Sequence, residues 1–238
     1  MTTLRVAWGK VSPRLLAMLW VGNAAAILLA LAWLQIPDSH VWQVAISFLC
    51  AAAWSASVLW LYADTFRRAS AEPRSGIARH VLVILIAIVV AWLLLQVFDA
   101  GRAKEGLFAG YWNSRFSAQG RVFFTYPRLV AWQRGFYDVL QWAVATVLLA
   151  MMFAAGVRRR FAGICRNIWY WVVAAVAGFL SVWVTGLLMD WTPGRSTKAQ
   201  IVSVLSRLLV AYTLDIVLLC WVIAVAAAAD ERAVDVKP

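Results

Sequence analysis

Six long apolar runs constrain this chain more than any other feature of its sequence. They cover residues 15–35, 41–63, 81–98, 139–157, 167–189 and 208–229, and Asp215 is the only charged residue in any of them. At about 1.5 Å of rise per residue, each run is about long enough to cross a hydrocarbon layer of roughly 30 Å as a helix. The sequence therefore predicts an all-α integral membrane protein, a bundle of six transmembrane helices.

The basic residues between the runs predict the orientation of this bundle. Three Lys or Arg residues precede the first run, and the connections 64–80 and 158–166 carry four each, whereas 36–40 carries none and 190–199 carries two. By the positive-inside rule, both termini are expected in the cytoplasm (N-in/C-in). The connection 99–138 opposes this assignment, because its six basic residues would lie outside. Connections of that length are translocated with less regard to charge.

The composition restricts the remaining function classes. A hydrophobic content of 64% in 238 residues leaves no room for a separate soluble catalytic domain, so we expect one membrane domain over 1–238. The net charge of +11 is scattered over the connections without a nucleic-acid-binding module, so no nucleic acid is expected as a partner. His40 and His80 are predicted on opposite sides of the membrane, so neither a metal nor a haem cofactor is expected.

The segment 99–138 is the least lipid-like part of the chain. It interleaves ten aromatic residues, Trp112 among them, with arginines that include Arg102 and Arg115. Such a mixture is too aromatic for a disordered linker and too charged for a membrane span. We expect an amphipathic helical segment between the third and fourth spans, on the extracytoplasmic surface. Thr125 before Pro127 predicts the start of a helix there.

Asp215 is a candidate functional residue because a carboxylate in hydrocarbon costs several kcal/mol unless it is paired, hydrated or protonated. Counting residues from the ends of the runs places Ser47, Gln141, Ser181 and Thr185 at a comparable depth, and these are its expected hydrogen-bond partners. Three interpretations stay open: an acid that holds helices together, a proton or cation site, and a ligand-binding residue in a cavity.

A second group of candidates lies at the predicted outer ends of the spans. Arg207 is expected either to reach lipid phosphates or to bridge one of three carboxylates, Asp99, Asp138 and Asp190. It cannot pair with Asp215, because about 12 Å of helix separates the two residues along the axis. Carboxylates beside arginines can serve acid–base chemistry or bind a phosphorylated lipid head.

The function that these features favour is that of a non-enzymatic, multi-pass protein of the cytoplasmic (inner) membrane of a bacterium. We expect it to bind a lipid, a small ligand or a partner membrane subunit, a second copy of itself included, through the segment 99–138. One alternative is a small transporter or channel in which Asp215 binds the coupling ion. Another is a lipid-modifying enzyme that uses Asp99, Asp138 or Asp190.

Overall fold

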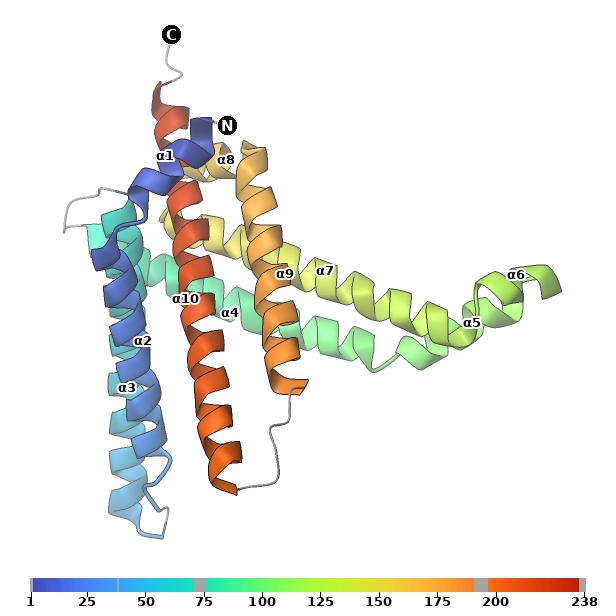
Figure 1. Cartoon of the computed structure of the whole chain (residues 1–238), viewed down its shortest axis with the longest axis horizontal. Coiled ribbons are helices and arrows are strands. Elements are labelled where there is room, and N and C mark those ends of the chain that lie inside the picture. The colour runs from blue at the N-terminus through green and yellow to red at the C-terminus, as the bar shows by residue number, and fades with distance from the viewer. Residues whose placement is uncertain (1, 38, 71–75, 191–196, 236–238) are drawn as a thin grey trace. The chain divides into compact units, whose positions relative to one another are not determined.

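The computed structural model of the chain describes residues 2–37, 39–70, 76–190 and 197–235 (Figure 1). The regular elements of these residues are all helices. In chain order they are α1 (Thr2–Lys10), α2 (Pro13–Trp33), α3 (Val41–Ala69), α4 (Ile77–Arg102), α5 (Glu105–Arg115), α6 (Ala118–Phe123), α7 (Tyr126–Phe153), α8 (Arg158–Arg166), α9 (Ile168–Asp190) and α10 (Thr197–Asp235).

Six of these helices are long and apolar enough to cross a membrane, namely α2, α3, α4, α7, α9 and α10. Each of them contains most or all of one predicted run. This confirms the all-α class and indicates a multi-pass membrane protein. Most residues in these helices are not buried against the rest of the chain, which is typical of helices that lipid or other proteins cover.

The fourth run and the helix that contains most of it differ at both ends. The run was expected over 139–157, but α7 begins at Tyr126 and ends at Phe153. Its start follows Thr125, as predicted. Its end is set by Ala155 and Gly156, whose φ angles of 49° and 74° lie in the left-handed region that stops a helix.

The contacts of the chain group into two compact units. Unit 1 comprises residues 1–84 and 150–238, and unit 2 comprises residues 85–149. The helices α4 and α7 therefore each contribute one end to unit 1 and the other end to unit 2. The expectation of a single membrane domain stays a prediction.

In unit 1, α10 is the central helix and packs against α1, α2, α3, α8 and α9. Its segment 222–229 is buried throughout and consists mainly of alanine, which lets neighbouring helices approach closely. The beginnings of α2 and α9, the end of α3 and the helices α1 and α8 surround the last turns of α10. We call this region the α1 end of unit 1 (Figure 1).

The helices α2 and α3 pack against each other in the same unit. A glycine at position 22 permits this contact, because a Cβ atom there would lie 2.7 Å from the side chain of Leu61. Polar contacts add to it: the indole of Trp54 donates to the carbonyl oxygen of Ala26 at 2.9 Å, and the hydroxyl of Tyr62 donates to Asn23 at 3.0 Å.

Unit 2 consists of the larger parts of α4 and α7 together with the short helices α5 and α6. The rings of Phe98 on α4 and Tyr137 on α7 lie 6.4 Å apart. Ser117 caps α6, since its hydroxyl oxygen accepts a hydrogen bond from the backbone N–H of Gly120 at 3.2 Å. The expected helical segment between the third and fourth spans is thus present as α5, α6 and the first turns of α7.

Candidate functional site

The structure divides the predicted site residues between the two units. Asp215, Arg207 and Asp190 belong to unit 1, and the side chain of Asp190 lies outside the described residues. The five others belong to unit 2: Asp99, Arg102, Trp112, Arg115 and Asp138.

Asp215 lies on α10 and has one of its expected partners. The hydroxyl of Ser181 on α9 donates to the Asp215 carboxylate at 2.6 Å. Two residues away on α10, Thr213 accepts a hydrogen bond from the indole of Trp20 on α2 at 3.2 Å. Polar contacts thus join α10 to α9 and to α2 at this level. Gln141, another expected partner, lies in unit 2 and accepts a hydrogen bond from Arg102.

Arg207 has a role that sequence reasoning missed. Its Nη1 donates to the carbonyl oxygen of Leu188 at 2.9 Å and to that of Met189 at 3.4 Å, both in the last turn of α9. The last carbonyls of a helix have no partner within the helix and carry a partial negative charge. Arg207 therefore caps α9 and ties its end to α10.

Arg102 and Asp138 form an ion pair in unit 2. The Nη2 of Arg102 on α4 lies 2.5 Å from Oδ1 of Asp138 on α7 and donates to Gln141 at 3.0 Å. This pair is partly solvated, since 67% of the Asp138 side chain is exposed. Asp99 is exposed and makes no ion pair within the described chain. The ion pair joins α4 to α7, and the carboxylate of Asp138 is bound to Arg102.

A second ion pair, between Glu105 and Arg134, was not predicted. Arg134 on α7 donates through Nε and Nη2 to both oxygens of Glu105 at the start of α5, with distances from 2.5 to 3.0 Å. These hydrogen bonds hold the pKa of the Glu105 carboxyl below its usual value. A guanidinium that binds both oxygens of a carboxylate in this way fixes the direction of α5 relative to α7.

Six aromatic rings form a continuous row across α5, the turn after α6 and the start of α7. The ring of Trp112 lies 5.9–6.4 Å from those of Phe108, Tyr111 and Phe116. Phe116 stacks on Phe124 at 4.8 Å, and Phe124 meets the edge of Trp132 at 5.6 Å. Four of the six are exposed, Trp132 to 63%. We call this row the aromatic surface: Phe108, Tyr111, Trp112, Phe116, Phe124 and Trp132.

Three arginines support the aromatic surface. The guanidinium of Arg115 lies 4.4 Å from the centre of the Tyr111 ring. Arg121 donates to the carbonyl oxygens of Phe116 and Ser114 at 3.0 and 3.1 Å. Arg128 donates to the carbonyl oxygen of Phe123 at 3.1 Å.

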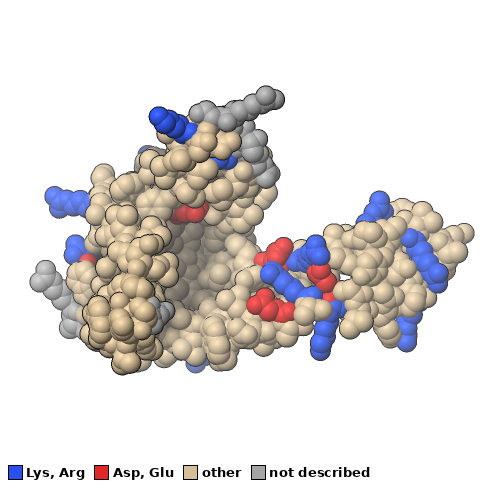
Figure 2. Space-filling view, turned by 90° about the horizontal axis from the view of Figure 1, so that it is seen from below, with Lys and Arg blue, Asp and Glu red and all other residues tan. Residues whose placement is uncertain are grey.

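None of these three arginines forms an ion pair with an acidic residue in the described part of the chain. In Figure 2, the α5–α6 end of unit 2 accordingly shows basic side chains without acidic ones beside them. Acidic and basic side chains lie together farther from that end in the same view. The three arginines therefore contact the backbone or a ring of this segment and give the aromatic surface positive charge.

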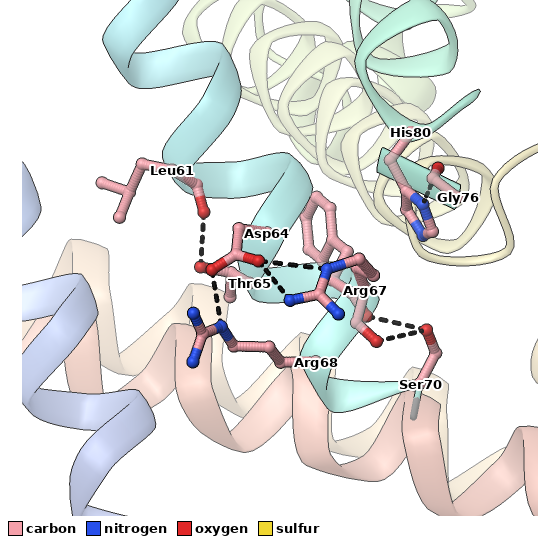
Figure 3. A network of polar contacts seen from close by, with 9 residues as sticks. Leu61, Asp64, Thr65, Arg67, Arg68, Ser70, Gly76 and His80 are labelled. Atoms are coloured by element: carbon pink, nitrogen blue, oxygen red, sulfur yellow. Dashed lines mark hydrogen bonds and ion pairs between the residues drawn. The ribbon is translucent and has the colours of Figure 1, made fainter. Parts of the chain in front are cut away.

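Sequence reasoning also missed the ion pairs at the α1 end of unit 1. Asp64, at 3% exposure, accepts hydrogen bonds from Arg67 and Arg68 on the same helix, both at 2.5 Å (Figure 3). Asp230 on α10 accepts two from Arg160 on α8 at 2.5 and 2.8 Å. Lys10 pairs with Glu231. The sequence showed these basic residues only as signals of orientation.

The described residues contain no group of three His, Cys, Asp or Glu side chains that could hold a metal ion. The chain shows no match to a protein-family model, to a curated protein sequence or to a solved structure.

Proposed function

We propose that this chain is a non-enzymatic, multi-pass protein of the cytoplasmic membrane that binds another membrane protein through the aromatic surface. The distribution of basic residues supports an N-in/C-in orientation, in which this surface faces the extracytoplasmic side. Trp, Tyr and Arg are the residues that contribute most to protein–protein binding energy. Their concentration in α5, α6 and the start of α7 is the basis of the proposal.

The observation that favours a protein over lipid head groups is the use of the arginines. Arg121 and Arg128 donate to backbone carbonyls of their own segment, and Arg115 lies on the ring of Tyr111. These contacts hold the rings in a fixed shape, which lowers the entropic cost of binding a partner of matching shape. Fluid lipid head groups gain little from such a fixed shape. The pair Glu105–Arg134 adds to the rigidity.

Replacing Trp112 by alanine is expected to reduce the amount of partner that co-purifies with the tagged protein about tenfold. Removing a central aromatic residue from an interface commonly costs more than 1 kcal/mol, and about 1.4 kcal/mol corresponds to a factor of ten. The measurement is quantitative mass spectrometry of the proteins that co-purify with the tagged chain in mild detergent. The reciprocal purification, with the tag on the identified partner, repeats the comparison. Trp92→Ala is the matched control, because this tryptophan is also exposed in unit 2 but lies outside the aromatic surface.

The control variant should recover the partner at the level of the unaltered protein. If both variants recover it equally well, or if only lipids co-purify with the unaltered protein, the proposal is wrong.

A transporter or channel is the second candidate, and the contact between Ser181 and Asp215 favours it over the enzyme. A carboxylate with a hydroxyl partner inside an apolar span can take up and release a proton or cation. In proteoliposomes, Asp215→Asn should then abolish pH- or cation-dependent flux while the helical content stays unchanged. Flux that is the same in both proteins, or absent from the unaltered one, rejects this candidate.

A lipid-modifying activity has less support than either of these functions. Of Asp99, Asp138 and Asp190, any of which could serve it, the side chain of Asp190 lies outside the described residues. The ion pair with Arg102 also engages Asp138.

A further inference from the structure

A cavity of about 410 Å³ opens at the α1 end of unit 1. Four helices enclose it: the end of α1, the first turns of α2, the end of α3 and the buried part of α10. The cavity has a charged part and an apolar part. Lys10, Arg14 and Arg68 supply positive charge, and apolar side chains that include Met18, Ile223 and Ala227 form the rest of the wall.

The charged part of the cavity suits an anion. Among the described residues, no acidic side chain lines it. Two of the cations are paired with acids elsewhere at the α1 end: Arg68 with the buried carboxylate of Asp64, and Lys10 with Glu231. Arg14 is exposed and forms no ion pair in the described part of the chain. A phosphate group can therefore bind Arg14 without first displacing a carboxylate from it.

The apolar part of the cavity suits a hydrocarbon chain. Met18 lies one helical turn after Arg14 on the same face of α2, so the wall becomes apolar directly below the charged rim. On α10, Ala224 and Ala227 leave room that larger side chains would fill. A soluble phosphate ester would occupy only the charged rim, whereas an acyl chain would also cover this apolar wall and gain free energy from its burial.

We propose that this cavity binds an anionic phospholipid, with the phosphate group at Lys10, Arg14 and Arg68 and an acyl chain along Met18 and the alanines of α10. The first turns of a membrane-spanning helix are where lipid head groups lie, so the cavity is at a suitable depth. This lipid site lies in unit 1 and is independent of the partner surface proposed for unit 2.

The test uses the full chain, purified and delipidated in neutral detergent. Native mass spectrometry or calorimetry measures binding of short-chain phosphatidylglycerol, of phosphatidylcholine with the same acyl chains, and of glycerol phosphate. Phosphatidylglycerol should bind most tightly, and Arg14→Gln should weaken it about tenfold, as expected for the loss of a hydrogen bond to a charged group. Arg5→Gln is the matched control, since Arg5 is exposed on α1 and does not line the cavity.

A second variant separates a lipid from a soluble phosphate. Met18→Trp places a large ring over the apolar wall without changing the charge. It should therefore weaken the binding of phosphatidylglycerol and leave the binding of glycerol phosphate unchanged. The proposal is overturned if phosphatidylglycerol and phosphatidylcholine bind equally, or if Arg14→Gln behaves like Arg5→Gln. The proposal is also overturned if glycerol phosphate binds as tightly as phosphatidylglycerol and Met18→Trp changes neither affinity.

Discussion

Replacing Asp64 by alanine should lower the free energy of unfolding by about 3 kcal/mol, because it removes one partner of a buried ion pair. The Asp64 side chain is 4% exposed and that of Arg67 is 11% exposed, so the guanidinium would lose its carboxylate where water is largely excluded. The ion pair with Arg68 contributes less to the free energy of unfolding, since the side chain of that arginine is 55% exposed. The measurement is unfolding in mixed detergent micelles, followed by circular dichroism.

Glu231→Ala is the matched control for this variant. It also removes an acid from an ion pair at the α1 end, but its side chain is 55% exposed. We expect a loss below about 1 kcal/mol, as for other solvated pairs. Equal losses in the two variants would show that the burial of Asp64 contributes nothing to its effect.

Replacing Asp230 by alanine should release α8 from α10. The Arg160–Asp230 pair joins these helices and is buried on both sides, with side-chain exposures of 16% and 10%. Its loss should lower the free energy of unfolding by about 3 kcal/mol. Arg158→Ala, which removes an exposed arginine from the same turn of α8, should have little effect.

The thiol of Cys165 on α8 reports this release directly. Burial raises the pKa of this thiol, so it should react slowly with maleimide near neutral pH in the unaltered protein. In a background where Cys50 and Cys220 are replaced by alanine, Asp230→Ala should accelerate the reaction and Arg158→Ala should not. An unchanged rate in Asp230→Ala would contradict the proposed attachment of α8.

The apolar runs predicted where the long helices lie, because hydropathy and length alone decide whether a segment can span a membrane. The start of α7 was also predictable, since the sequence around Thr125 and Pro127 favours a helix start. Its end was not, because the left-handed residues Ala155 and Gly156 lie within an uncharged stretch that hydropathy counts as part of the run.

The site residues were predictable to different degrees for a physical reason. Depth counting found Ser181 as a partner of Asp215, because both lie on regular helices whose levels follow from residue number. The cap that Arg207 places on α9 and the pair Arg160–Asp230 depend on which helices are neighbours. One sequence does not contain that information in a local pattern.

The most direct test of the proposed partner surface is photo-crosslinking in the intact membrane. A benzoylphenylalanine at Val122, which is 73% exposed on α6, should give a cross-link to another membrane protein that mass spectrometry can identify. The same group at Val97, exposed on α4 of unit 2, is the control. We predict a protein cross-link at position 122 and none at position 97. Cross-links to lipid alone, or the same proteins at both positions, would contradict the account.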